Sequence, residues 1–260
     1  MENDFNLNSE VKIHGTRWNT FHDGYFSDLN IALPFLETIS REIRSTKPSV
    51  VADLGGGTGF ILSEISKRHP QAGLRFINVD ISPKQLCECD DKNISSLQMS
   101  ITEVERNSLI KDNGSLMLII RSVLHYMGYE GVIPFLKHLR NQLNPGEILI
   151  HQTACFETIK EADCINRLYS LMRTPKWYPT IASLCQTLKE TGWDVLSYSP
   201  APDLLLKSAD LAERYSLKEE NIFQICSELG NNYDLPAIFK TDGRKFGAYL
   251  KYSIFTCQAR

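Results

Sequence analysis

Two aspartates and a cluster of glycines are the residues whose types and spacing most directly suggest chemistry. Asp53 ends a short apolar run, and four glycines follow closely: Gly55, Gly56, Gly57 and Gly59. A turn without Cβ atoms lets a ligand lie against bare backbone, and apolar residues at helical spacing begin at Phe60. Asp80 ends a second apolar run about 20 residues further on, the distance expected for a carboxylate that binds ribose hydroxyls. These features predict a nucleoside-containing ligand at a strand–turn–helix unit.

Two other interpretations of these residues can be weighed from the spacing. A dinucleotide fingerprint requires G-x-G-x-x-G, and the third glycine position is Phe60 or Leu62 in the two possible registers. Neither register fits. Asp80 could instead cap the helix that follows it, but Ser82-Pro83 already supplies an N-cap and a first helical residue. We therefore expect Asp80 to contact a ligand.

The pattern acidic-x-G-x-G-x-G resembles motif I of the class I, small-molecule-type S-adenosylmethionine (SAM)-dependent methyltransferases. The resemblance implies that SAM is the cofactor, that S-adenosylhomocysteine is its product, and that the glycine turn passes under the amino-acid half and ribose of SAM. Many relatives place an aspartate against adenine at the third strand, where this chain has Ser100 and Ile101 instead. We expect these two residues, together with Ile81 and Arg121 at neighbouring strand ends, to contact the cofactor.

Candidate catalytic residues follow the apolar run 116–120. The segment that ends in His125 and Tyr126 is similar to the V-L-H-H/Y segment at the fourth strand of many small-molecule methyltransferases. Ligands of open α/β sheets bind outside the carboxyl ends of the strands, so we expect both residues near the transferred methyl group. His125 is either a general base or a residue that orients this loop through a backbone hydrogen bond. His151, at the expected end of the fifth strand, is a second candidate base.

Aromatic stretches before and after the central pattern are candidates for enclosing the ligands. Arg17 and Tyr25 are expected to contact the amino-acid end of SAM. The expected substrate-binding residues are Trp18, Phe26, Trp177 and Tyr178. The alternative for each aromatic residue is simple packing against a neighbouring helix.

The order of apolar runs predicts an α/β fold. We expect a three-layer αβα sandwich whose seven-stranded, mostly parallel sheet has an antiparallel last strand, plus a helical cap or lid. Residues 1–47 are predicted to form an N-terminal helical lid, and 48–260 the SAM-binding methyltransferase domain with cap insertions at about 153–179 and 200–245. Among the expected elements are helices 34–44, 203–214 and 218–229 and strands 96–100, 193–198 and 249–258.

Composition and charge limit the kinds of partner that we expect this protein to bind. A net charge of −3 and a pI near 6.1 give no attraction to nucleic acid, and no apolar run reaches the length of a membrane span. The seven cysteines contain no C-x-x-C pair, and Arg121-Ser122 stands where metal-dependent catechol-type enzymes have acids. We expect a reduced, cytoplasmic monomer or homodimer with a small-molecule substrate and no metal.

Three functions remain open. The first is O- or N-methylation of a small, partly apolar molecule. The second is a SAM-binding protein of methyltransferase fold that carries out other chemistry, such as cyclisation or rearrangement. The third is a non-catalytic SAM-binding module. The intact glycine motif favours retention of the cofactor, but the first two functions share that motif.

Overall fold

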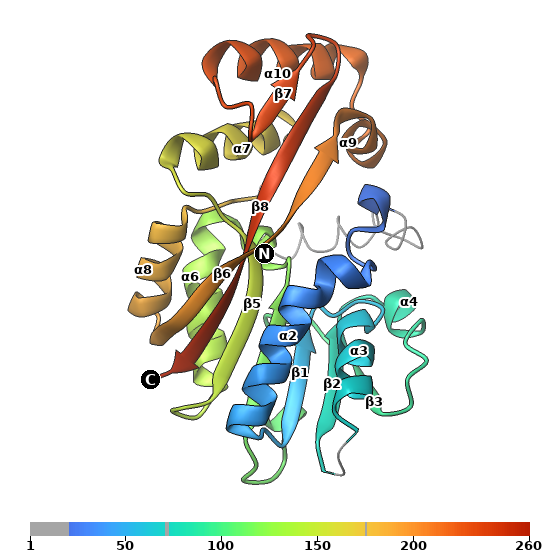
Figure 1. Ribbon diagram of the computed structural model, residues 1–260, viewed down its shortest axis with the longest axis vertical. Coiled ribbons are helices and arrows are strands. Elements are labelled where there is room, and N and C mark those ends of the chain that lie inside the picture. Colours follow the sequence, from blue (N-terminus) through green and yellow to red (C-terminus); the bar gives the residue numbers. More distant parts are fainter. Residues whose placement is uncertain (1–20, 71–72, 175) are drawn as a thin grey trace.

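A twisted sheet of eight strands forms the centre of the protein (Figure 1). The computed structural model describes residues 21–70, 73–174 and 176–260. The strand order is β3-β2-β1-β4-β5-β8-β6, and β7 pairs with β8. The strands are β1 (Val50–Leu54), β2 (Arg75–Asp80), β3 (Ile94–Gln98), β4 (Leu116–Arg121), β5 (Ile148–Ala154), β6 (Trp193–Lys207), β7 (Phe239–Thr241) and β8 (Phe246–Ala259).

The first five strands are parallel, and β8 runs antiparallel to β5, β6 and β7. Strands β1 and β4 are apolar throughout their central residues because both of their faces are covered. The predicted seven-stranded path with an antiparallel last strand is confirmed, and the short strand β7 is an addition. Strand β3 begins and ends two residues earlier than predicted. Met99 and Ser100 therefore lie after the strand.

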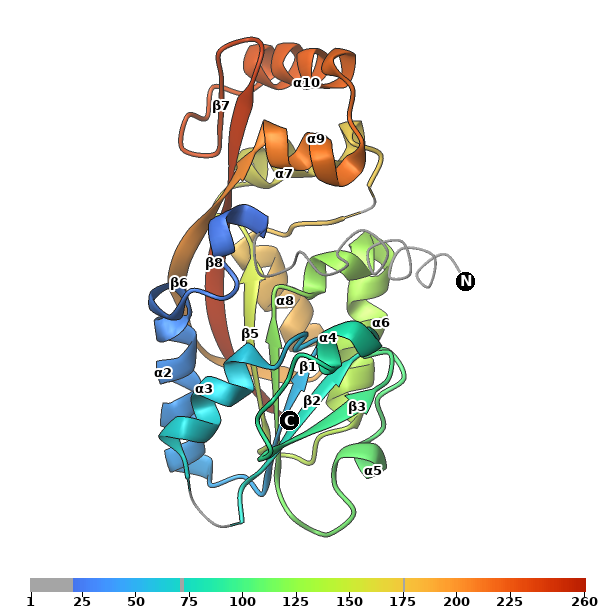
Figure 2. The same cartoon turned by 90° about the vertical axis from the view of Figure 1, so that its right-hand side faces the viewer.

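Helices cover both faces of the sheet, as predicted for a three-layer sandwich (Figure 2). One face packs against α2 and α3, and the other against α6 and α8. The helices are η1 (Phe21–Gly24), α2 (Leu29–Thr46), α3 (Phe60–Arg68), α4 (Pro83–Leu86), α5 (Arg106–Leu109), η2 (Leu124–Met127), α6 (Gly128–Asn141), α7 (Ile159–Leu171), α8 (Ile181–Glu190), α9 (Ser208–Tyr215) and α10 (Glu219–Asn232). No helix of the described residues is long and apolar enough to cross a membrane.

Helix α2 starts at Leu29, five residues before the predicted start at Pro34. Asp28 caps it by accepting hydrogen bonds from the backbone N–H groups of Asn30 and Ile31, a stronger start signal than the proline. Its apolar face packs on the central strands beside α3, where Phe35 and Leu36 are fully buried. The helix therefore belongs to a layer of the sandwich, and the division of the chain at residue 47 stays a prediction.

A distal lobe continues the sheet beyond its carboxyl end. It contains α7, α9, α10, β7 and the outer parts of β6 and β8, which share one apolar cluster (Figures 1 and 2). The predicted helix 203–214 was wrong at its start, because Pro200–Lys207 extends β6 past two register shifts and α9 begins at Ser208. Alternation of Leu204 and Leu206 toward the lobe interior explains the extension.

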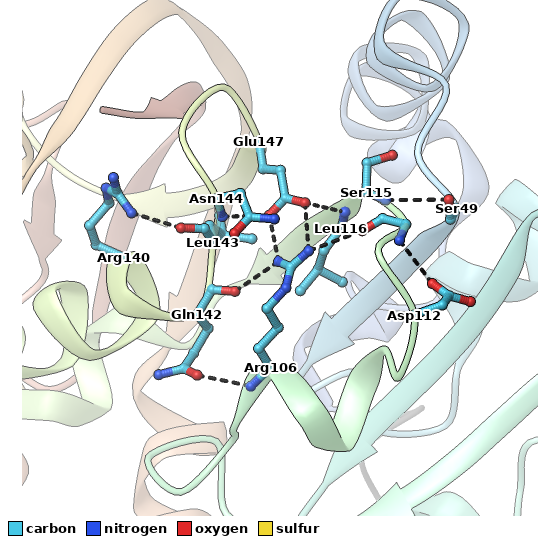
Figure 3. A network of polar contacts seen from close by, with 11 residues as sticks. Ser49, Arg106, Asp112, Ser115, Leu116, Arg140, Gln142, Leu143, Asn144 and Glu147 are labelled. Atoms are coloured by element: carbon cyan, nitrogen blue, oxygen red, sulfur yellow. Dashed lines mark hydrogen bonds and ion pairs between the residues drawn. The ribbon is translucent and has the colours of Figure 1, made fainter.

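An ion pair lies at the amino ends of β4 and β5, at the opposite end of the sheet from the glycine turn (Figure 3). Arg106 donates two hydrogen bonds to Glu147, at 2.6 and 2.9 Å. Glu147 also accepts from the backbone N–H of Leu116, at 2.8 Å, and of Asn144, at 2.7 Å. This largely buried carboxylate therefore joins the starts of β4 and β5, which aligns their far ends where ligands are expected.

Candidate functional site

Four strands bring polar side chains to one face at the carboxyl end of the sheet. Asn78 of β2 and Asp53 of β1 are register partners, as are Arg121 of β4 and Gln152 of β5. All four share the face that α2 and α3 cover, since each alternates with apolar residues of that layer. Each carries at least one buried polar atom without a hydrogen-bond partner among the described residues: Asp53 Oδ1, Asn78 Oδ1, Arg121 Nε and Nη2, and Gln152 Oε1. Such orphaned groups are costly and indicate a missing partner.

The glycine turn joins β1 to α3 in a conformation that requires glycine. Gly55, Gly57 and Gly59 have positive φ angles of 76°, 58° and 76°. A Cβ on Gly56 would lie 2.3 Å from Asn78 Oδ1 and 2.7 Å from Asp53 Oδ2. Asn78 Nδ2 also donates to the Gly57 carbonyl at 2.9 Å. The polar row and the turn therefore form one packed unit.

Asp80 fastens this turn from the neighbouring strand. Its carboxylate accepts hydrogen bonds from the backbone N–H groups of Gly57, at 3.0 Å, and Ser82, at 2.8 Å. Ser82 Oγ in turn caps α4 through the Gln85 N–H, as predicted. Burial raises the pKa of the Asp80 carboxyl, while these backbone donors act to lower it. A carboxylate has about four acceptor positions, so these bonds leave capacity for a further donor such as a ribose hydroxyl.

Asp53 and Arg121 form an electrostatically coupled pair. Burial raises the pKa of Asp53 to about 7, although the Arg121 guanidinium acts to lower it. Burial likewise lowers the pKa of Arg121, and Asp53 opposes that shift. Within the described part of the chain, Arg121 donates one hydrogen bond, to the Phe26 carbonyl at 2.9 Å. This partial satisfaction leaves two guanidinium nitrogens for an anionic group.

The predicted adenine contacts lie beyond the end of β3. Ile101 is buried in the core layer of α6, with Val104 and Leu109 as neighbours in that cluster. The hydroxyl of Ser100 lies 2.8 Å from that of Thr102 and closes a local turn. Ile81 follows Asp80 directly and is half-buried. Their contact with a cofactor stays a prediction.

His125 and Tyr126 lie on η2, immediately after β4. The His125 ring is buried between Tyr126, with ring centroids 4.1 Å apart, and Tyr178, at 5.3 Å and nearly parallel. Trp177 donates its backbone N–H to the His125 carbonyl at 3.2 Å. These contacts bring the loop between α7 and α8 to η2, and a substrate-binding role for Trp177 and Tyr178 stays a prediction.

His151 does not lie at a strand end as predicted. Strand β5 continues to Ala154, and the His151 ring is fully buried on the face covered by α6 and α8, stacked on Phe255. Its Nδ1 lies 2.7 Å from the Thr153 hydroxyl, and burial lowers its pKa to about 3. The strand was expected to end at His151 because the next two residues, Gln152 and Thr153, are polar, but both belong to β5. The environment is that of a structural histidine.

The segment before α2 covers the end of β4. The guanidinium of Arg121 lies over the rings of Tyr25, at 5.9 Å, and Phe26, at 5.6 Å. The Tyr25 hydroxyl donates to the Pro202 carbonyl of β6, and its ring stacks on Tyr252. Tyr25 thus lies beside Arg121, and its contact with the cofactor stays a prediction. The two other predicted residues of this segment, Arg17 and Trp18, lie outside the described residues.

Several residues of this region were not predicted from the sequence to belong to a site. Ser122 has a left-handed φ of 61° directly after β4, and its hydroxyl contacts that of Tyr252 at 2.5 Å. Strained non-glycine backbone of this kind is concentrated at functional sites. Asn78 was detectable as an amide inside an otherwise apolar strand. The remaining missed residues lie on distant elements: Gln152, Tyr169, Lys176, Arg214, Tyr215 and Tyr252.

Comparison with known proteins gives structural matches alone. No protein-family model and no curated protein matches the sequence. The structure of a putative methyltransferase from Bacillus halodurans is 11% identical, covers 80% of this chain and 91% of its own, and has a TM-score of 0.62. The YcgJ protein from Bacillus subtilis is 13% identical, with coverages of 81% and 92% and a TM-score of 0.61.

A third structure extends the match over nearly the whole chain. Magnesium protoporphyrin IX methyltransferase from Synechocystis PCC 6803, solved with bound S-adenosylhomocysteine, is 11% identical and has a TM-score of 0.54. It covers 99% of this chain and 95% of its own. The chain has the fold of the SAM-dependent methyltransferases. Within this methyltransferase fold, the glycine turn and the polar row occupy the carboxyl edge, where ligands of open α/β sheets bind.

Proposed function

We propose that this protein is a SAM-dependent methyltransferase that acts on a small, partly apolar molecule. The observation that carries the proposal is the glycine turn at the carboxyl end of β1, held by Asp80 within a methyltransferase fold. One structural match, magnesium protoporphyrin IX methyltransferase, is named for a small-molecule substrate, which supports the substrate class.

The polar strand residues beside the glycine turn have the chemistry to bind the amino-acid half of SAM. That half is a zwitterion, with one carboxylate and one ammonium group. Arg121 would hold the carboxylate through Nε and Nη2, and the free oxygens of Asp53 and Asn78 would accept from the ammonium. Asp80 would bind the ribose hydroxyls, and the absence of Cβ atoms on Gly55–Gly59 would let the cofactor lie against backbone. The orphaned atoms thus match the charges of the ligand.

The chemistry that remains for the protein is positioning. Bound SAM supplies a methyl group on a sulfonium centre, which is a good leaving group. Tyr126, Trp177 and Tyr178 would hold the acceptor in line beside η2, and Phe26 would shield the Arg121 side from water. His125 would accept the proton that an O–H or N–H acceptor loses. Precise orientation by buried rings supplies much of the required acceleration.

Two experiments test this function, first calorimetry for SAM binding and then radiolabelling for methyl transfer. We expect the purified protein to bind SAM and S-adenosylhomocysteine, and Asp80→Ala to weaken binding by about 2 kcal/mol, because charge-assisted hydrogen bonds are lost. Binding of NADH in place of SAM would overturn the assignment. Transfer of radiolabelled methyl from SAM into a small-molecule extract then separates methylation from other uses of SAM. A protein that binds SAM without any labelled product would instead belong to the non-methylating class.

A further inference from the structure

The chain leaves β4 through a serine in an unfavourable backbone conformation. Ser122 directly follows Arg121, the last residue of β4, and has a left-handed φ of 61°. Its backbone N–H still donates to the Gln152 carbonyl of β5 at 2.8 Å, so the turn begins where the strand ladder ends. Left-handed backbone is costly for a residue with a Cβ, and it persists only where surrounding contacts hold it. The contacts that hold Ser122 therefore need an explanation.

The Ser122 side chain is anchored on β8. Its hydroxyl lies 2.5 Å from the Tyr252 hydroxyl, and both residues are buried. Tyr252 is itself well fixed, because its backbone pairs with β5 on one side and β6 on the other and its ring stacks on Tyr25. Burial raises the pKa of the Tyr252 phenol above its ordinary value, so the phenol stays protonated and the hydroxyl–hydroxyl bond persists at working pH.

The residues on either side of Ser122 belong to both halves of the proposed site. Arg121, immediately before it, carries the guanidinium nitrogens proposed for the cofactor carboxylate. Val123, immediately after it, lies against the glycine turn, since a Cβ on Gly55 would be 2.9 Å from Val123 Cγ2. Helix η2, which carries His125, starts one residue later. A rotation about the Ser122 backbone would move these groups relative to one another, because each residue has two soft dihedral angles.

We propose that Ser122 and Tyr252 are a pair of positioning residues: their hydroxyl–hydroxyl bond holds the turn after β4 and thereby fixes the Arg121 guanidinium and the His125 ring relative to the glycine turn. Both hydroxyls act through their neighbours and not through contact with a ligand. This inference rests on the proposed function, because it takes Arg121 as a ligand of the cofactor. A glycine at position 122 would adopt the left-handed conformation without strain, but it would lack the hydroxyl that anchors the turn.

Calorimetric affinity for S-adenosylhomocysteine tests the cofactor half of the inference. Tyr252→Phe removes one oxygen and keeps the ring stack, and Ser122→Ala removes the other oxygen and keeps the Cβ. Each should weaken binding by about 3- to 10-fold, as expected for one lost neutral hydrogen bond. The double variant should bind as well as either single variant, because all three lack the same bond. Additive losses, or a lower thermal stability with unchanged affinity, would overturn the proposal.

NMR of the His125 imidazole tests the acceptor half. This ring lies between those of Tyr126 and Tyr178, so a small displacement changes the ring-current field at its protons. In protein with isotope-labelled histidine, the His125 signals are those that disappear in His125→Phe. We expect Tyr252→Phe to shift these signals and to leave those of His69, at the end of α3, in place. Unmoved His125 signals in Tyr252→Phe would overturn the proposal.

Two matched controls separate this pair from similar residues. Ser216→Ala changes another serine with a left-handed φ, of 52°, which is exposed at the end of α9. Tyr198→Phe changes a tyrosine of β6 that also stacks on a ring, that of Phe255, but is exposed. Neither should change the affinity or the His125 signals, and losses equal to those of the pair would contradict the inference. If the wild type binds no S-adenosylhomocysteine, the proposed function fails, and the His125 signals still decide whether the pair positions η2.

Discussion

At the scale of single residues, Asp53 is a fully buried carboxyl group that we propose to contact the cofactor. Its folded-state pKa of about 7 lies above the ordinary value of 3.8, so the folded protein binds more protons than the unfolded chain between these values. The contribution of Asp53 to the free energy of unfolding therefore falls as pH rises from about 4 to about 7. Removing the carboxylate should remove this part of the pH dependence.

The test is urea unfolding of Asp53→Asn at several pH values without ligand. We expect the variant to gain stability relative to the wild type as pH rises through this window, and to bind SAM at least tenfold more weakly because the ammonium loses a charged acceptor. Asp234→Asn, which changes an exposed aspartate of the lobe, is the control. A pH-independent difference between Asp53→Asn and the wild type would contradict the raised pKa.

His125 poses a separate question at the residue scale, because a base and an orienting residue predict different kinetics. If it accepts the acceptor's proton, His125→Ala should lower kcat by about 10²–10⁴-fold with little change in SAM affinity. If it only supports η2 between the rings of Tyr126 and Tyr178, His125→Phe should preserve that stacking and most of the activity. Single-turnover methyl transfer by the two variants decides between these roles. High activity of His125→Phe would exclude the base.

How far single residues could be predicted depended on where they stand in the sequence. Asp53 and Asp80 were visible because each ends an apolar run. Gln152 was hidden because strand β5 continues past it, and the same continuation explains why His151 was wrongly placed at a strand end. Ser122 and Tyr252 meet only after the sheet has formed, a contact between distant segments that no local pattern records.

At the scale of elements, the glycine turn is the unit on which cofactor binding depends. Gly57→Val should cost stability, because a β-branched residue is strained at a φ of 58°. It should also reduce SAM affinity more strongly than Gly146→Val, since the added atoms would face the Gln85 amide 2.6 Å away and the space proposed for SAM. Gly146 also has a positive φ, but its Cβ would meet open space. Thermal unfolding and calorimetry of both variants separate strain from the loss of ligand space.

The outcome contradicts the proposed site if both variants lose SAM affinity equally. Both positions have positive φ angles, so a positive φ alone does not distinguish them, whereas the contact with Gln85 and the space proposed for SAM are at Gly57. A larger effect at Gly57 would place the ligand at the turn between β1 and α3.

Among the elements, those with a strong local signal were predicted well. The parallel strands and the sandwich layers follow from apolar runs and helical periodicity. The start of α2 was missed because Asp28 caps the helix ahead of Pro34, and the end of β6 was missed because an exposed middle stretch with two prolines separates its first residues from the buried Leu204 and Leu206. In both cases a capping or tertiary contact outweighed the helix start or strand end that the prolines suggested.

At the scale of the whole molecule, the protein consists of a sandwich and a lobe that share two long strands. The lobe has its own apolar cluster, and β6 reaches it through two register shifts. Separate clusters allow one region to open while the other stays folded. We therefore expect native-state hydrogen exchange of α9, α10 and β7 to require less free energy than exchange of β1, β4 and β5.

Two buried leucines, one in each part, make this expectation specific. Leu229 of α10 and Leu118 of β4 are both fully buried, in the lobe and sandwich clusters respectively. Leu229→Ala should lower the opening free energy of the lobe by about 2–5 kcal/mol and leave exchange in β4 nearly unchanged, whereas Leu118→Ala should lower protection in β4 and leave that of the lobe nearly unchanged. If Leu229→Ala destabilised β4 as much as α10, sandwich and lobe would unfold as one unit. Independent opening would instead let α9, whose Arg214 contacts the Tyr126 hydroxyl, move away from η2 and admit an acceptor without disturbing the cofactor turn.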